Sequence, residues 1–121
     1  MRLSLVNEKL NIEFEWYEQL WAVRIDRSIE IPIAHIKSIT TAEPQITWQE
    51  VRAPGTFLPG VIKAGTYYTR QGKDFWYVTN DCRYLTLELQ DETYRRLILT
   101  IPDNQVWCDR INTELNSIVD N

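Results

Sequence analysis

The sequence predicts a mainly β domain of about seven antiparallel strands with one C-terminal α-helix. Segments in which apolar and polar residues alternate, the pattern of a half-buried strand, recur through residues 3–101. A segment with apolar residues at helical spacing, residues 103–119, follows the last of them directly. Because no strand–helix–strand alternation and no internal repeat is present, we expect a barrel or sandwich rather than a parallel α/β fold.

The first half of the chain predicts several short strands and one long insertion. Strands are expected over residues 3–6, 10–14, 21–25 and 29–34, continued by a β-branched run to residue 41. Residues 15–20 fit either a turn of helix, with Trp16, Tyr17 and Leu20 on one side, or a wide hairpin connection. Pro32 marks its strand as an edge or as ending there. Residues 42–60 hold three of the five prolines and two of the four glycines, which predicts a long loop.

The second half is more regular. Residues 61–69 and 74–80 predict a hairpin that turns at Gln71, Gly72 and Lys73. Strands over residues 84–90 and 94–101 are joined by a turn at 91–93. In the helix that follows, Asp103 is the expected N-cap. One face of this helix is apolar, and its Trp107 is expected to be the largest buried group; the face comprises Trp107, Cys108, Ile111, Leu115 and Ile118.

Composition and charge limit the function classes. The chain has 121 residues, of which 44% are hydrophobic, and a net charge of −4, so we expect one domain that does not bind nucleic acid. Residues 1–10 lack the pattern of a secretory signal, and no apolar run is long enough to span a membrane. Cys82 and Cys108 fit no metal or redox spacing. We therefore expect a cytoplasmic protein with reduced thiols.

No catalytic or metal-binding constellation stands out. His35 is the only histidine, and a structural hydrogen bond is the simplest role for it. Asp74, Asp81 and Asp91 lack the spacing of a calcium loop and are expected to be solvated turn residues. A second group of charged residues is expected either to form a small basic patch or to pair across strands with Glu88 or Glu92; it comprises Lys73, Arg83, Arg95 and Arg96, with possible additions from Arg52 and Lys63. The sequence predicts neither an enzyme nor a cofactor.

A further set of stretches extends over most of the chain from residue 31 onward and comprises residues 31–39, 53–56, 59–60, 64–67, 73–78, 96–99 and 102–103. Together they resemble a family of small bacterial pleckstrin-homology (PH)-like proteins of uncharacterised function. The resemblance implies seven strands in two near-orthogonal sheets, with the C-terminal helix closing one corner, and it implies no catalytic residues. PH domains that bind phosphoinositides carry several basic residues in the loop between their first two strands. The matching region here has Glu13, Glu15 and Glu18 and no basic residue, so phosphoinositide binding is disfavoured.

Surplus aromatic residues are the best functional lead. Tyr67 and Tyr68 are neighbours on one expected strand, and Trp76 and Tyr77 on another, so one residue of each pair should point outward. Exposed aromatic side chains, together with the Pro-interrupted edge strand, favour a non-catalytic module. It would bind a protein partner or a second copy of itself through aromatic and sheet-edge surfaces. A large two-layer core that shields these rings is the structural alternative. The candidate binding residues are Trp48, Arg52, Phe57, Lys63, Tyr68 and Trp76.

A second functional interpretation is a pocket for a small ligand. It would lie between the 52–68 region and the sheet, and Arg52, Phe57, Lys63 and Tyr68 would line it. Several convergent polar groups beside aromatic walls are typical of such sites.

Overall fold

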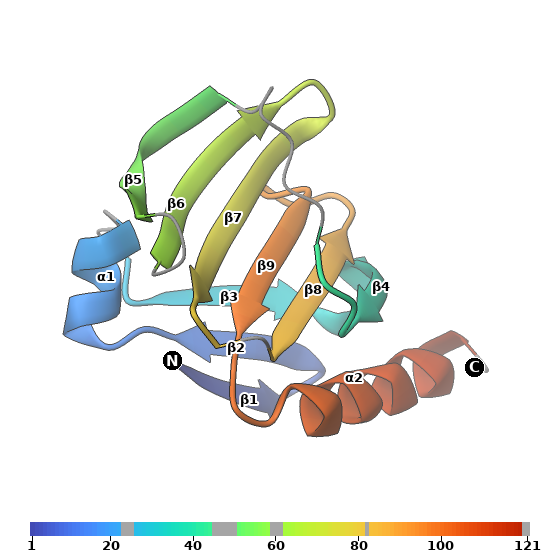
Figure 1. Ribbon diagram of the computed structural model, residues 1–121. Coiled ribbons are helices and arrows are strands. Elements are labelled where there is room, and N and C mark those ends of the chain that lie inside the picture. The colour runs from blue at the N-terminus through green and yellow to red at the C-terminus, as the bar shows by residue number, and fades with distance from the viewer. Residues whose placement is uncertain (23–25, 45–50, 59–61, 82, 120–121) are drawn as a thin grey trace.

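The computed structural model describes residues 1–22, 26–44, 51–58, 62–81 and 83–119, and for residues 51–58 it describes the backbone (Figure 1). These residues form nine strands, two α-helices and one 3₁₀ helix. The prediction of a mainly β chain with a C-terminal helix is confirmed.

A small antiparallel sheet is formed by the N-terminal strands. It contains β1 (Arg2–Val6), β2 (Lys9–Glu13) and β3 (Ser28–Pro32) in that order. Asn7 and Glu8 both have positive φ, 53° and 61°, which is the backbone of a tight two-residue hairpin turn between β1 and β2. Helix α1 (Trp16–Ala22) lies between β2 and β3 along the chain.

The larger sheet has six strands in the order β4-β8-β9-β7-β6-β5. Their bounds are β4 Ile36–Thr40, β5 Val51–Leu58, β6 Ile62–Thr69, β7 Gly72–Thr79, β8 Tyr84–Leu89 and β9 Arg96–Thr100. The expectation of antiparallel strands is wrong for one pair, because β9 runs parallel to β7. The cause is the path from β7 to β8, which leaves room for one strand between them, and β9 fills that position.

The two sheets cross at a steep angle and are joined by a short 3₁₀ helix, η1 (Ile33–His35), between β3 and β4 (Figure 1). The β-branched run expected from residue 29 to 41 is therefore broken. Pro32, which has no amide donor, ends β3 at this bend. The described strands form two open sheets rather than a closed barrel, because the first ends at β1 and β3 and the second at β4 and β5.

Helix α2 (Asn104–Val119) runs beside η1, β4 and β8. It begins one residue after Asp103, whose backbone carbonyl accepts a hydrogen bond from the Trp107 amide at 3.0 Å. Ile111 and Cys108 are buried, as expected from the apolar face. Trp107 is only partly buried, with the Arg110 guanidinium 4.4 Å from its ring centroid, so the expectation that it is the largest buried group is wrong.

The main core fills the space between the two sheets. Its fully buried members come from both sheets, η1 and α2, and they include Leu10, Ile12, Ile33, Phe75, Leu85, Leu87, Leu97, Leu99 and Ile111. A smaller apolar cluster, Tyr67, Trp76 and Ile98, lies on the opposite face of the six-stranded sheet. The centre of this sheet is therefore buried on both faces.

Two predicted elements differ in kind from the structure. The expected long loop 42–60 contains strand β5, in which Pro54 and a register shift between Arg52 and Gly55 are accommodated because β5 is an edge strand. The expected strand 21–25 is wrong at its start, since Trp21 and Ala22 belong to α1, while residues 23–25 lie outside the described part of the chain. The helical alternative for residues 15–20 is the correct one.

Candidate functional site

Helix α1 is fixed to the body of the protein by its buried side. The Glu15 amide donates a hydrogen bond to Glu18 Oε1 at 2.8 Å, which is the reach-back half of a capping box at the start of the helix. The same carboxylate pairs with the N-terminal ammonium group of Met1. Glu18 and Ala22 are buried, so this side of α1 faces the protein.

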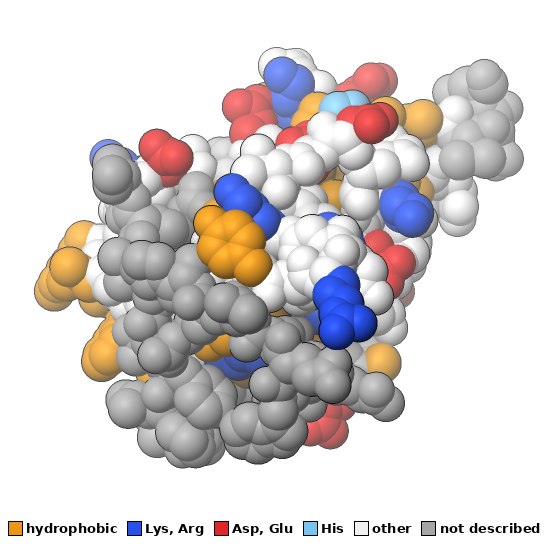
Figure 2. All heavy atoms as spheres, turned by 90° about the horizontal axis from the view of Figure 1, so that it is seen from above, with side chains coloured by type: hydrophobic (Ala, Val, Ile, Leu, Met, Phe, Trp, Pro, Cys, Tyr) orange, Lys and Arg blue, Asp and Glu red, His pale blue; other side chains and the backbone are white. Residues whose placement is uncertain are grey.

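The opposite side of α1 exposes large apolar side chains. The exposed fractions are 69% for Trp16, 45% for Tyr17, 67% for Leu20 and 43% for Trp21. The spacing i, i+1, i+4 and i+5 places these residues on one face of the helix, which we call the aromatic face of α1. In Figure 2, hydrophobic side chains gather at the edge of the molecule where Figure 1 places α1.

The inner side of α1 lies beside β5 and β6. The helix also comes close enough to Tyr77 on β7 for its charge to act there. Burial raises the pKa of the Tyr77 hydroxyl above its ordinary range, and the nearby charge of Glu18 raises it further, followed by Tyr17. Tyr77 is itself buried, with a phenol that remains neutral next to a carboxylate. Because the side of α1 that carries Glu18 faces the protein, the aromatic face is turned away from it.

The six residues predicted to bind a ligand or partner are only partly brought together. Lys63 and Trp76 are in direct contact, with Lys63 Nζ 3.5 Å from the Trp76 ring centroid and 4.3 Å from that of Tyr67. Tyr68 is 44% exposed, and Lys73 Nζ lies 5.4 Å from its ring centroid. Trp48 and the side chains of Arg52 and Phe57 lie outside the described residues, although strand pairing sets Phe57 opposite Lys63. The small-ligand pocket predicted there stays a prediction.

The expectation that Trp76 contributes an exposed ring is wrong. Trp76 and Tyr77 point to opposite faces of β7, yet both are buried, because each face of the central sheet is covered. For the other pair the expectation is confirmed, since Tyr67 is buried and Tyr68 is exposed. Alternation along β7 indicated the two directions correctly, but it carried no information about what covers each face.

Two of the residues expected to form a basic patch or to pair with Glu88 or Glu92, Arg95 and Arg96, pair with Asp74. Asp74, expected to be a solvated turn residue, is fully buried on β7. Its Oδ2 accepts hydrogen bonds from Arg95 Nη2 at 2.9 Å and from Arg96 Nη2 at 2.7 Å and Nε at 3.2 Å. Asp81 does lie near the surface, where its pairing with Arg83 lowers the pKa of the Asp81 carboxyl. The arginines therefore serve the fold at this position.

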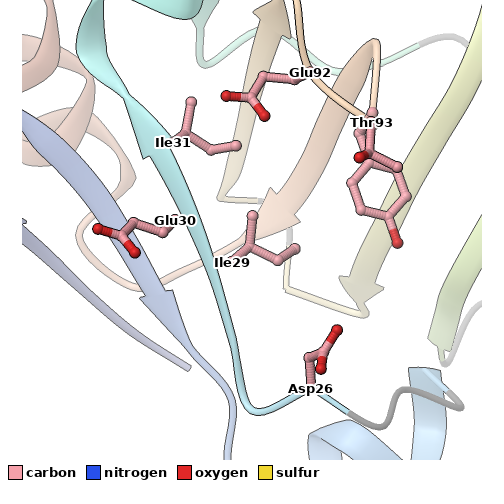
Figure 3. Close-up of a pocket in the computed structure, with 7 residues that line it drawn as sticks. Asp26, Ile29, Glu30, Ile31, Glu92 and Thr93 are labelled. Atoms are coloured by element: carbon pink, nitrogen blue, oxygen red, sulfur yellow. The ribbon is translucent and has the colours of Figure 1, made fainter.

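A hollow of about 260 Å³ opens between β3 and the connection from β8 to β9 (Figure 3). Ile29 and Ile31 project from one side of β3 and Glu30 from the other. Asp26 and Glu92 lie at the two ends of the hollow. The lining is completed by Thr93 and Tyr94. His35 Nδ1 lies 2.8 Å from Glu92 Oε1, so the histidine makes a structural hydrogen bond, as expected.

A second hollow of about 400 Å³ lies along the same strand. Its lining comes from the two hairpin strands and β3 and comprises Val6, Asn7, Lys9, Asn11, Ser28 and Glu30. Glu30 borders both hollows. Neither hollow was expected from the sequence, because each is formed by residues whose proximity depends on how the strands pair.

Within the described part of the chain, no group of three or more histidine, cysteine or acidic residues is placed to hold a metal ion. Neither described helix has the length and apolar character needed to cross a membrane. Comparison with protein-family models, curated proteins and solved structures found no match.

The aromatic face of α1 is the clearest candidate site, and sequence reasoning did not place it among the binding residues. A signal was present, since the helical alternative for residues 15–20 already put Trp16, Tyr17 and Leu20 on one side. Spacing alone did not say whether that side faces the core or the solvent. The burial of Glu18 shows that its side of α1 faces the protein and that the aromatic face is exposed to solvent. The sequence does not reveal this burial, because it depends on contacts such as the ion pair with Met1.

Proposed function

We propose that this chain is a non-catalytic, PH-like binding module that docks a protein partner through the aromatic face of α1. The observation that carries the proposal is the exposure of four large apolar side chains on a helix of seven residues. Two crossing sheets and a C-terminal helix support the PH-like part of the proposal, and a cytoplasmic location remains part of it.

The chemistry of this face fits protein recognition. Trp and Tyr are enriched at the centres of interfaces, where they provide contact area and lose few rotatable bonds on binding. The rings of Trp16 and Tyr17 pack edge to face with their centroids 5.8 Å apart, so part of the surface is ordered before any partner arrives. Such preorganisation lowers the entropy lost on docking.

The size of the face favours a partner of different sequence over a second copy. With aromatic side chains of 150–250 Å² about half exposed, the face presents roughly 400 Å². Two such faces packed against each other would bury roughly 800 Å², below the ~1,200 Å² of stable specific interfaces. A groove in another protein could cover the flanks of α1 as well and reach the standard size.

Site-specific photo-crosslinking in cells that express the protein natively tests this proposal. A benzophenone amino acid replaces Leu20 in one variant and Val106, a 57% exposed apolar residue on α2, in the matched control. We expect a discrete adduct with one protein from position 20, and we expect Trp16→Ser in the same chain to abolish it. Equal adducts from positions 20 and 106, or none from position 20, would reject the proposal.

Sedimentation velocity separates self-association from binding to another protein. The wild-type chain is expected to remain monomeric up to about 100 µM, since an interface of this size is smaller than those of stable dimers. A dimer that is lost in Trp16→Ser/Leu20→Ser, and kept in Val106→Ser, would replace the separate partner by a second copy of this chain.

A further inference from the structure

On the outer edge of β3, the backbone groups pair with no other described strand. Two backbone hydrogen bonds flank the paired region of β2 and β3. The Phe14 amide donates to the Arg27 carbonyl at 2.7 Å, and the Ile33 amide donates to the Glu8 carbonyl at 2.9 Å. In an antiparallel ladder the bonded residues alternate, so Ile29 and Ile31 bond to β2. The amides of Ser28 and Glu30 and the carbonyls of Ser28, Glu30 and Pro32 therefore point away from β2.

This edge has neither a bulge nor an interior proline, two of the features that protect edge strands. Among the described strands, β3 pairs only with β2, and their register runs without a bulge from Ser28 to Pro32. Its single proline is the last residue of the strand. By contrast, β5 carries Pro54 and a register shift, and β4 has a register shift and lies against α2. Of these edges, β3 is the one best suited to accept another strand.

The two hollows lie on opposite faces of the small sheet, and both border β3. A strand paired with β3 would run about 4.8 Å from it and would point alternate side chains to opposite faces of the sheet. On one face, the hollow of about 260 Å³ has the buried Ile29 and Ile31 on its β3 side (Figure 3). On the other face, the hollow of about 400 Å³ has Ser28 and Glu30 along its border.

The charge of these surroundings favours a basic occupant. Three carboxylates line the first hollow, those of Asp26, Glu30 and Glu92, and no Lys or Arg is among its described lining residues. Lys9 Nζ lies 3.6 Å from Glu30 Oε1, and His35 binds Glu92. The described lining is therefore acidic, in a chain whose net charge is −4.

We propose that β3 binds an extended, basic peptide segment as an added antiparallel strand. Backbone hydrogen bonds at Ser28 and Glu30 hold the peptide. Lys or Arg side chains of the peptide lay their aliphatic stems over Ile29 and Ile31. One brings its charge to Asp26 at one end of the hollow and another to Glu92 at the other end. This site is separate from the aromatic face of α1 and does not depend on it.

The test uses an eight-residue peptide of alternating Lys and Val and the matching peptide of alternating Glu and Val. Titrated into the wild-type protein and followed by NMR, the basic peptide is expected to slow hydrogen exchange at the Ser28 and Glu30 amides. The acidic peptide is expected to leave both amides unchanged. Equal effects of the two peptides, or protection located elsewhere in the chain, would overturn the proposal.

A matched pair of variants then isolates the backbone contribution. Ser28→Pro removes an outward amide at the first position of the strand, where proline is tolerated, whereas Ser28→Ala keeps the amide. Loss of one hydrogen bond should weaken binding of the basic peptide about 3–10-fold in Ser28→Pro and leave Ser28→Ala within about twofold. Equal affinity of the two variants contradicts strand addition. If Ser28→Pro does not fold, amide exchange in the wild-type protein decides the question.

Trp16→Ser/Leu20→Ser distinguishes this proposal from the preceding one. The variant should bind the basic peptide as the wild type does, because α1 lines neither hollow. Loss of peptide binding in this variant would refute a separate site on β3, while the crosslinking result at position 20 would stand by itself.

Discussion

Asp74 on β7 and Arg96 on β9 face each other across the parallel strand pair of the sheet, joined by a 2.7 Å hydrogen bond from Arg96 Nη2 to Asp74 Oδ2. Arg95 binds the same carboxylate oxygen from the loop before β9. The carboxylate is completely buried, while both guanidinium groups keep some exposure. The cluster thus ties β9 into its position beside β7.

Replacement of Asp74 should destabilise the fold strongly. Asp74→Asn keeps the shape of the side chain but leaves the two arginines without their buried countercharge. Removing one partner of a buried ion pair costs about 3–5 kcal/mol, and the partial exposure of the arginines should place this variant near 3 kcal/mol. Urea denaturation measures the loss. Asp81→Asn, in the surface pair with Arg83, is the control and should unfold at nearly the wild-type midpoint.

Tyr77 should make the protein sensitive to alkaline pH. Its pKa is raised in the folded state, mainly by burial and then by Glu18, so the folded protein holds the phenol proton where the unfolded chain releases it. The stabilisation is fully present below the unfolded pKa of about 10 and is lost as the pH rises above it. Urea midpoints measured from pH 8 to 11 should fall more steeply for the wild type than for Tyr77→Phe. Parallel curves would show that Tyr77 is not the group responsible.

Truncation of the apolar face of α2 should be costly only where that face is buried. Ile111 is fully buried against the main core, so Ile111→Ala should lose about 2–5 kcal/mol through the cavity it leaves. Glu114 is exposed on the same helix, and Glu114→Ala should stay within about 0.5 kcal/mol of the wild type. Equal small losses in thermal or urea unfolding would mean that α2 does not dock as the structure has it.

Gly72 should resist substitution because of its backbone. Its φ of +136° begins β7 in a conformation that L-residues rarely adopt, and an added Cβ would lie 3.4 Å from Arg95 Cβ. Gly72→Ala is expected to lose about 1–3 kcal/mol of stability. Gln71→Ala, at the neighbouring exposed turn position, serves as the control and should change the urea midpoint little. A Gly72→Ala midpoint equal to that of the control would contradict this account.

The local sequence pattern was sufficient to predict a helix or strand wherever one face of that element is buried and the other is exposed to solvent. The alternation in residues 84–90 and 94–101, the turn at Gly72 and the helical spacing of 103–119 predicted β8, β9, the β6–β7 hairpin and α2 to within a few residues. Each of these signals depends on neighbours within one turn or two residues along the chain. Sequence alone also limited α1 to two alternatives.

Tertiary structure decided which elements meet and which surfaces remain outside. Placement of β9 between β8 and β7 made the Asp74–Arg96 pair and the parallel register, and a second covered face buried Trp76. Burial of Glu18 turned the aromatic face of α1 outward. Local periodicity records the direction of a side chain but not what lies opposite it, because strand neighbours and covering layers are set by residues far away in the sequence.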